Sequence, residues 1–351
     1  MVPANRIYSP RASLVPFLTA KEAAALPYPP NAIPGARDVE TFYGTMRVYE
    51  WGPENGDKVI FVHGDATPSP IFSKIAQGLV DSGHRVMLFD LWGRGYSDTP
   101  LDCRHDVRLF ETQILLALAS SSVSWTGSDS RFSIIRFSLG GPIALAFAGV
   151  FPELVHSVVL FGPAGLLQRL PKGYDDQLIR HPETAPSKEA IREKVRQILG
   201  LTPSPTPDVQ LSEDWSLPFE SSVYRVEQNF DLGAILQWQF DHHLGHVYSF
   251  QDTIRYGPAR GMEDAWATAC DIIAGRTRSD CPLHNSNLLV LFGEDDVDVV
   301  GTETTEQILE LLPPDHLQTQ YIPGDHGFPY PNSEMITKIL VSFWNPTRSM
   351  L

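Results

Sequence analysis

The sequence predicts an α/β fold in which a mostly parallel, twisted sheet carries helices on both of its faces. Short and almost wholly apolar runs, such as VIFV, FSIIRF and LLVLF, are typical of strands that a parallel sheet buries on both sides. These runs alternate with stretches of helical periodicity, which is the pattern of a parallel sheet covered by helices. The alternation is lost between about residues 166 and 259, so we expect an inserted helical cap there.

The first predicted elements follow a proline-rich leader, residues 1–35, that ends near the motif YPPNAIPG. Strand-like runs at 38–42 and 45–51, with a glycine turn between them, predict an antiparallel hairpin. The alternation then begins. Its expected members are the strand VIFV, a helix at 72–79, the strand RVMLFD, a helix at 107–119, the strand FSIIRF, the helix GGPIALAFA and the strand SVVLF.

The region without alternation is rich in proline and polar residues, yet it holds two helical stretches. One is capped by Ser187 and closed by Gly200, and the other runs from about Asp231 to His242. Core elements then resume, namely a helix at 265–273, the strand LLVLF, a helix at 302–312, the strand LQTQYI and a helix at 333–343. We therefore divide the chain into a leader (1–35), a first core part (36–164), a cap (165–259) and a second core part (260–351).

Charge and composition disfavour several classes of protein. A formal net charge of −15 argues against nucleic-acid binding, which gains affinity from lysines and arginines that displace counterions. No run approaches the roughly 20 apolar residues of a membrane span, and the chain start lacks the pattern of a secretory signal, so we expect a cytoplasmic location. The cysteines, Cys103, Cys270 and Cys281, are too scattered to suggest disulfides or a zinc ribbon.

Four short motifs, each directly after a predicted strand, carry candidate chemistry. They are HGD at 63–65, RFSLGG around Ser138, GEDD at 293–296 and GDHG around His326. Open parallel sheets place their sites at the carboxyl ends of the strands, so we expect these motifs to meet. A serine hydroxyl becomes a nucleophile when a histidine takes its proton, and the histidine needs an acid to stabilise its charged form. The order serine, acid, histidine accompanies a nucleophile on a strand-to-helix turn.

These motifs together resemble the α/β-hydrolase superfamily, over roughly residues 36–164 and 260–345. HGDATPS resembles the oxyanion loop, and FDLWGRGYSD resembles the glycine-rich turn after the fourth strand. RFSLGG, LFGEDD and PGDHGF occupy the nucleophile, acid and histidine positions. The cap stretch WQFDHHLGHVYSFQDTIRYGP also resembles fungal members with a helical cap, some of them associated with natural-product pathways.

The resemblance implies Ser138 as the nucleophile, His326 as general base and then general acid, and Asp296 as the group that holds the imidazole. The backbone N–H groups of Asp65 and Leu139 are expected to form the oxyanion hole. No metal or organic cofactor is implied, and the expected partner is a hydrophobic small-molecule substrate.

Alternatives stay open at three positions. Asp295 is the reserve for Asp296, because several acids crowd that loop. The Asp65 carboxylate would raise the energy of an oxyanion, so only its backbone is expected to face the site. Arg136 stands where the pattern G-x-S-x-G has its first glycine. Either its side chain passes along the sheet end toward an acidic partner and the turn survives, or the turn is altered; we expect the former.

The cap supplies candidates for substrate contacts, namely Trp238, Phe240 and His243. His242 and His246 form an i, i+4 pair, but no glutamate stands beside them as in H-E-x-x-H, so a zinc site is disfavoured. In GRGYSD, Asp98 replaces the last glycine of a dinucleotide fingerprint, which favours a tight turn with a structural Arg94 and Ser97.

The sequence thus predicts a serine hydrolase, esterase-like, that cleaves an ester, lactone or thioester of a hydrophobic small molecule through an acyl-enzyme. The same triad also suits an acyltransferase or a lyase that cleaves a carbon–carbon bond. A noncatalytic small-molecule-binding protein, with a turn impaired by Arg136, is the alternative from another class.

Overall fold

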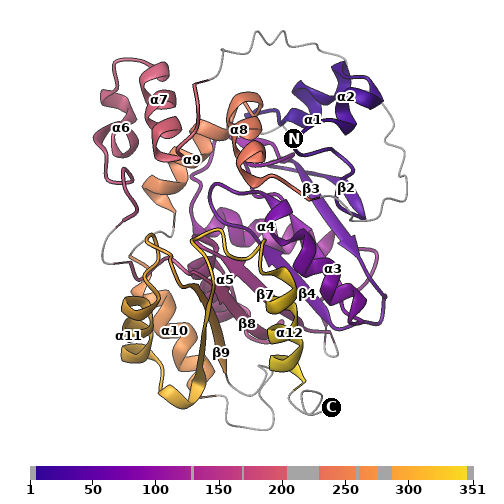
Figure 1. Ribbon diagram of the computed structural model, residues 1–351, viewed down its shortest axis with the longest axis vertical. Coiled ribbons are helices and arrows are strands. Elements are labelled where there is room, and N and C mark those ends of the chain that lie inside the picture. Colours follow the sequence, from indigo (N-terminus) through magenta and orange to yellow (C-terminus); the bar gives the residue numbers. More distant parts are fainter. Residues whose placement is uncertain are drawn as a thin grey trace.

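The computed structural model describes residues 5–127, 130–167, 170–203, 229–257, 261–275 and 287–345. Its centre is an eight-stranded sheet with the order β10-β9-β8-β7-β4-β5-β3-β2 (Figure 1). In chain order these strands are β2 (Ala36–Thr41), β3 (Gly44–Trp51), β4 (Lys58–Val62), β5 (Arg85–Phe89), β7 (Phe132–Phe137), β8 (Val155–Phe161), β9 (Leu288–Gly293) and β10 (Leu317–Ile322).

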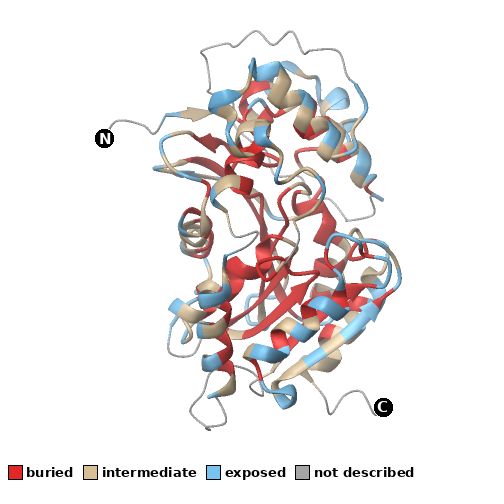
Figure 2. Cartoon of the chain, turned by 90° about the vertical axis from the view of Figure 1, so that its left-hand side faces the viewer, coloured by how far each residue is buried: buried red, intermediate tan, exposed pale blue. Residues whose placement is uncertain are grey.

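Strand β2 pairs antiparallel with β3, and β3 with β5, whereas every other neighbouring pair in this sheet is parallel. The predicted hairpin and the mostly parallel sheet are therefore confirmed. All residues of β5, β7 and β9 are buried, which explains why these strands are unbroken apolar runs in the sequence. Figure 2 shows the buried strands through the middle of the molecule, with exposed residues on the outer helices.

Helices cover both faces of the sheet, as predicted. Ile60 and Val62 of β4 pack into the core on one face, and Val59 and Phe61 pack into the core on the other. The first face is covered by α4 (Val107–Ala119), α5 (Gly140–Val150), α10 (Glu263–Ala274) and α11 (Gly301–Leu311). The second is covered by α3 (Ser73–Asp81) and α12 (Ser333–Trp344). No helix of the described residues is long and apolar enough to cross a membrane.

Helices of the inserted region lie beyond the carboxyl ends of the strands (Figure 1). They are α6 (Gln177–Arg180), α7 (Lys188–Ile198), α8 (Leu232–His242) and α9 (His246–Tyr256). The sequence predicted α7 and α8, and both begin where a side chain caps the helix, Ser187 for α7 and Asp231 for α8. It missed α6 and α9. A small apolar cluster joins these helices, formed by Ile179, Val195, Phe240, Phe250 and Ile254.

The leader is packed against the core. Its elements are β1 (Arg6–Ile7), which pairs with β6 (Thr99–Pro100), and the helices α1 (Pro10–Ser13) and α2 (Ala20–Ala24). Tyr28 is fully buried and donates a hydrogen bond of 3.1 Å to the Asp90 carboxylate. Its ring also contacts Tyr96 and, on α8, Trp238. Tyr28 of the leader therefore contacts both the core and a helix of the inserted region. Cys103 and Cys270 are free thiols, and Cys281 lies outside the described residues.

Buried histidines join α8 and α9 to the loop between β5 and α4. His243 donates from Nε2 to the Ser97 carbonyl at 2.8 Å, and His105 contacts the Pro100 carbonyl at 2.9 Å and Ser249 Oγ at 2.6 Å. Burial lowers the pKa of His105 to about 3 and that of His243 to about 4. Both rings are neutral at pH 7.

Acid is therefore expected to weaken the fold. The unfolded chain takes up a proton per histidine near pH 6.5, whereas folded His105 and His243 do not until pH 3–4. The free energy of unfolding should fall as the pH drops below about 6.5, by about 2 kcal/mol per buried histidine at pH 5. Urea unfolding at pH 7.5 and pH 5 measures this. A His105→Gln variant should lose less stability on acidification; an unchanged pH dependence would contradict the assignment.

Arg136 lies in β7 on the α4 side and is fully buried. Its Nε, Nη1 and Nη2 have no hydrogen-bond partner within the described part of the chain. Burial lowers the pKa of the guanidinium, and the negative charge of Glu111 on α4 opposes this in part. The expected acidic neighbour is thus present, without a hydrogen bond between the two side chains.

Replacing this arginine should stabilise the protein. Arg136→Met removes an unpaired buried charge and keeps an unbranched chain, so we expect the free energy of unfolding to rise by about 1–4 kcal/mol. Arg47 is a matched control, because it is equally buried but donates to Asp38 at 2.7 Å and to the Pro30 carbonyl at 2.8 Å. Arg47→Met should destabilise. Calorimetry on both variants tests the contrast, and a parallel loss of stability would refute it.

Candidate active site

Ser138 sits on a sharp turn between β7 and α5. It is the one non-glycine residue with positive φ, 55°, in the described ranges. A Cβ added at Gly140 would lie 3.1 Å from both Arg136 Cδ and the Val62 carbonyl oxygen, and one at Gly141 would lie 2.6 Å from Pro163 Cβ. A side chain at Gly141 would therefore clash, and one at Gly140 would fit only if its neighbours moved by a few tenths of an ångström. Arg136 has not altered the turn, because its side chain turns into the core.

A chain of hydrogen bonds runs from Ser138 through His326 to Asp296. Ser138 Oγ lies 2.8 Å from His326 Nε2, and His326 Nδ1 lies 2.6 Å from Asp296 Oδ2. The other carboxylate oxygen of Asp296 accepts from the N–H groups of Asp298 and Val299, both at 2.9 Å, which fixes its orientation. Among the crowded acids of this loop, Asp296 contacts the histidine and Asp295 does not.

Two backbone N–H groups of residues that line the cavity with Ser138 make no hydrogen bond within the described residues. Those of Asp65 and Leu139 have no hydrogen-bond partner among the residues that the structure describes. His63 holds the turn before Asp65: its Nδ1 donates to the Gly64 carbonyl at 2.7 Å, and its Nε2 accepts from Leu91 N–H at 2.9 Å. Burial lowers the pKa of His63 to about 3, which keeps the ring neutral and able to accept.

The Asp65 side chain forms an ion pair with Arg94. Burial raises the pKa of this carboxyl to about 6, and the positive charge of Arg94 opposes the rise. One carboxylate oxygen, Oδ1, accepts from the guanidinium, and the other, Oδ2, is buried without a partner in the described chain. Arg94 of the GRGYSD turn is thus buried in contacts within the protein, and it is the group that binds the Asp65 carboxylate.

A cavity of about 390 Å³ opens beside Ser138 and His326. Its wall is mainly apolar and combines core residues with residues of the inserted helices. The side chains include Ile71, Phe137, Leu167, Tyr174, Ile198, Leu199, Leu232, Leu236 and Val299. Charged residues among its lining are Asp65, Lys172, Asp298 and Asp325. A volume of this size accommodates a small organic molecule.

The structure places the three predicted substrate-contact residues away from this cavity. Trp238 is buried against Tyr28 and Tyr96, Phe240 belongs to the apolar cluster of the inserted helices, and His243 binds the Ser97 carbonyl. Residues Leu232 and Leu236, one turn apart on α8, line the cavity instead. Their i, i+4 spacing marked a second apolar face of this helix, which the emphasis on aromatic residues overlooked.

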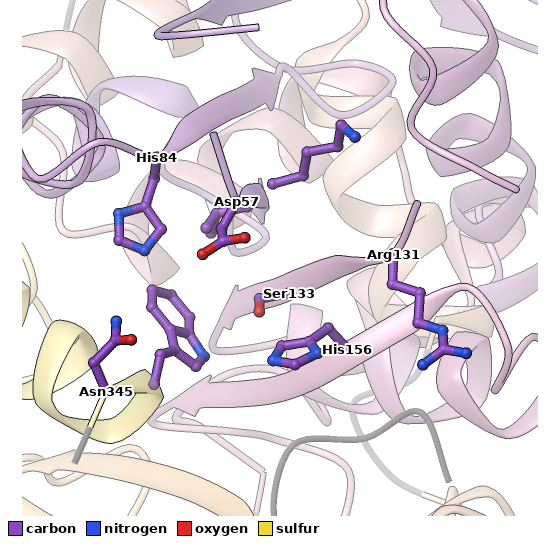
Figure 3. A pocket seen from close by; sticks show the side chains of 9 residues that line it. Asp57, His84, Arg131, Ser133, His156 and Asn345 are labelled. Atoms are coloured by element: carbon purple, nitrogen blue, oxygen red, sulfur yellow. The ribbon is translucent and has the colours of Figure 1, made fainter. Parts of the chain in front are cut away.

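A second cavity, about 360 Å³, lies at the opposite, amino-terminal end of the strands (Figure 3). Asp57, His84, Arg131, Ser133 and His156 are among its lining residues. It contains none of the residues around Ser138, so it is separate from the candidate active site. The described residues hold no group of three or more His, Cys, Asp or Glu side chains arranged to bind a metal ion.

Comparison with known proteins agrees with this architecture. A family model described as the alpha/beta hydrolase fold matches residues 57–328, which is more than half of the chain. A serine hydrolase-like protein from Danio rerio is 30% identical over 145 residues, which are 39% of this chain and 42% of that protein. The match thus spans less than half of that relative's length.

Solved structures resemble most of the chain. A hydrolase from Pseudomonas aeruginosa PA01 gives a TM-score of 0.59 at 15% identity, covering 88% of this chain and 98% of its own. Carboxylesterase CesB from Bacillus subtilis gives 0.56 at 16% identity, covering 89% and 91%. At identities of 15–16%, the likeness to these structures shows the fold alone, whereas the family model is matched by the amino-acid sequence. With both in agreement, the chain belongs to the α/β-hydrolase fold family of enzymes.

Proposed function

We propose that the protein is a serine hydrolase that cleaves an ester, lactone or thioester of a hydrophobic small molecule through an acyl-enzyme. Ser138 is the nucleophile, His326 the general base and then the general acid, and Asp296 the orienting acid. The observation that carries this proposal is the unbroken hydrogen-bond chain from Ser138 Oγ to Asp296 Oδ2, with steps of 2.8 and 2.6 Å.

A side chain of the proposed triad serves each step of the reaction. His326 Nε2 accepts the hydroxyl proton while Ser138 Oγ attacks the substrate carbonyl. Asp296 accepts from Nδ1–H, which keeps Nε2 free to act as a base and stabilises the imidazolium that forms. His326 then gives the proton to the leaving alcohol or thiol. Water activated by the same histidine releases the acid and restores Ser138.

The negative oxygen of the tetrahedral intermediate is stabilised by the N–H groups of Asp65 and Leu139. Neither N–H group has a hydrogen-bond acceptor among the described residues, so both can donate to a bound oxyanion. Leu139 also begins the first turn of α5, and the amino end of a helix favours negative charge. Preorganised donors of this kind account for a large part of catalysis in acyl transfer.

The cavity wall supports a hydrophobic substrate. The acyl or alcohol part would rest against Leu232 and Leu236 of α8 and Ile198 of α7. A role in a natural-product pathway stays a prediction from the cap sequence. Water as the final acceptor gives hydrolysis; an alcohol or amine as acceptor would give acyl transfer, and analysis of the products with added acceptors separates the two.

An active-site probe tests the nucleophile. A fluorophosphonate should label the wild-type protein at Ser138, because His326 activates its hydroxyl, and Ser138→Ala should abolish both labelling and hydrolysis of p-nitrophenyl esters. Peptide mapping by mass spectrometry identifies the labelled residue. A folded wild-type protein that resists the probe and turns over no ester would favour the noncatalytic alternative.

The acid is tested by a pair of neighbouring substitutions. Asp296→Asn should lower kcat by about 10³–10⁴-fold, because the imidazole loses the acceptor that sets its tautomer. Asp295→Asn, one residue away and without contact to His326, should leave kcat within about twofold. Steady-state kinetics on both variants decides the assignment. Equal losses would mean that the loop, rather than the Asp296 carboxylate, is required.

A further inference from the structure

Arg94 occupies the centre of a polar contact between the oxyanion loop and the inserted helices. It lies in the loop between β5 and β6 and is fully buried. Its Nε donates to the Asp65 carbonyl at 2.9 Å, its Nη2 donates to the Asp65 carboxylate, and its Nη1 donates to the Trp92 carbonyl at 2.7 Å. The guanidinium thus binds the same aspartate at two points, one on the backbone and one on the side chain.

The two terminal nitrogens of the guanidinium also bind α9. Nη2 donates to Thr253 Oγ1 at 2.9 Å, and Nη1 donates to Ser249 Oγ. Ser249 in turn lies 3.0 Å from the Trp92 carbonyl. Asp65 is therefore connected to a helix of the insertion through one side chain, although 184 residues separate it from Ser249 in the sequence (249 − 65).

This arrangement bears on the oxyanion in two ways. The Asp65 N–H group lies in the peptide plane that it shares with the Gly64 carbonyl. Arg94 binds the carbonyl of the next peptide plane, that of Asp65 itself, and so restricts how the loop can rotate on the far side of Asp65. The carboxylate must also be kept from the oxyanion, because two negative charges in a poorly solvated site repel strongly. Asp65 lines the cavity. Among the described residues, Arg94 is the only positively charged residue that forms an ion pair with Asp65.

We propose that Arg94 is a positioning residue for catalysis: held on α9 by Ser249 and Thr253, it fixes the Asp65 backbone for oxyanion binding and holds the Asp65 carboxylate away from the developing charge. This inference rests on the proposed serine hydrolase function. In this proposal, the contacts of α9 with Arg94 help to form the oxyanion hole. The inserted helices therefore contribute to catalysis as well as to the wall of the cavity.

A purely structural arginine would behave differently. Its loss would lower stability and leave the kinetics of the folded fraction unchanged. Loss of a positioning residue lowers kcat in the folded enzyme, with KM little changed, because the contact matters most when the oxyanion forms. It also weakens binding of an inhibitor that carries an oxyanion, such as the hemiketal of a trifluoromethyl ketone, in proportion to the loss of kcat.

The first experiment uses Arg94→Met, measured at a temperature where circular dichroism confirms the folded state. We expect kcat to fall at least about tenfold, since loss of one oxyanion donor costs about 10²–10³-fold in acyl transfer. The inhibition constant of the trifluoromethyl ketone should rise by the same factor. In Arg94→Met/Asp65→Asn, kcat should recover in part, because the carboxylate charge that Arg94 neutralises is then absent. A kcat equal to wild type in Arg94→Met would overturn the proposal.

The second experiment tests the connection to α9. Ser249→Ala/Thr253→Val removes both hydroxyl contacts to Arg94 and should lower kcat several-fold, although it changes no residue of the oxyanion loop. Arg192→Met is the matched control: Arg192 also lies in the insertion and donates to the Phe240 carbonyl at 2.9 Å, but it has no contact with Asp65. It should leave kcat within about twofold. Equal kcat values in the double variant and wild type would overturn the part assigned to α9.

These outcomes are distinguishable from failure of the proposed function. If wild-type protein is not labelled by the fluorophosphonate, the serine hydrolase function fails, whatever the Arg94 variants do. If wild type is labelled and Arg94→Met retains its kcat, only the positioning role of Arg94 fails.

Discussion

The site depends on one unfavourable backbone conformation, the left-handed turn at Ser138. Such a conformation costs a non-glycine residue about 1–2 kcal/mol. Three backbone hydrogen bonds oppose this cost: Ser138 N–H donates to the Phe161 carbonyl at 2.9 Å, and the Ser138 carbonyl accepts from Gly141 and Ala164 at 2.9 and 3.1 Å. At about 0.5–1.5 kcal/mol each, they are sufficient to hold the turn. Ser138 is therefore held by backbone contacts to β8, to α5 and to the loop after β8.

Polar contacts join the insertion to the core alongside the apolar packing of Phe230, Ile235 and Trp238. Gln239 of α8 donates to the Ala66 carbonyl at 2.8 Å and accepts from Gly95 N–H at 2.7 Å, beside the buried histidines and Arg94. A buried polar group without its partner costs free energy, whereas an apolar surface can slide with little loss. These contacts consequently define a single position for α8 and α9 above the strands.

The sequence was sufficient for the order of the core strands and for the choice of Ser138, His326 and one acidic loop as candidates, because these depend on local signals. An apolar run identifies a buried strand, and a glycine-rich turn after it identifies the place of Ser138 or His326. Long-range packing could not be predicted in the same way. Tyr28 is a leader residue whose burial depends on Asp90 and Trp238, and the choice between Asp295 and Asp296 depends on where His326 lies. The direction of the Arg136 side chain likewise depends on the space between β7 and α4.

Helix α8 presents different residues to two environments. Leu232 and Leu236 form part of the cavity wall, while Trp238 packs on Tyr28 and Tyr96. Substitutions on the first face would reshape the space available to a ligand and leave the aromatic contact with the leader intact. Of the two leucines, Leu232 also packs against the core cluster that contains Tyr28, Tyr96 and Trp238, so Leu236 is the position where a substitution would change the cavity with the smaller effect on the fold. In this family member, one helix therefore carries both a residue that shapes the space for a ligand and residues that hold the fold together.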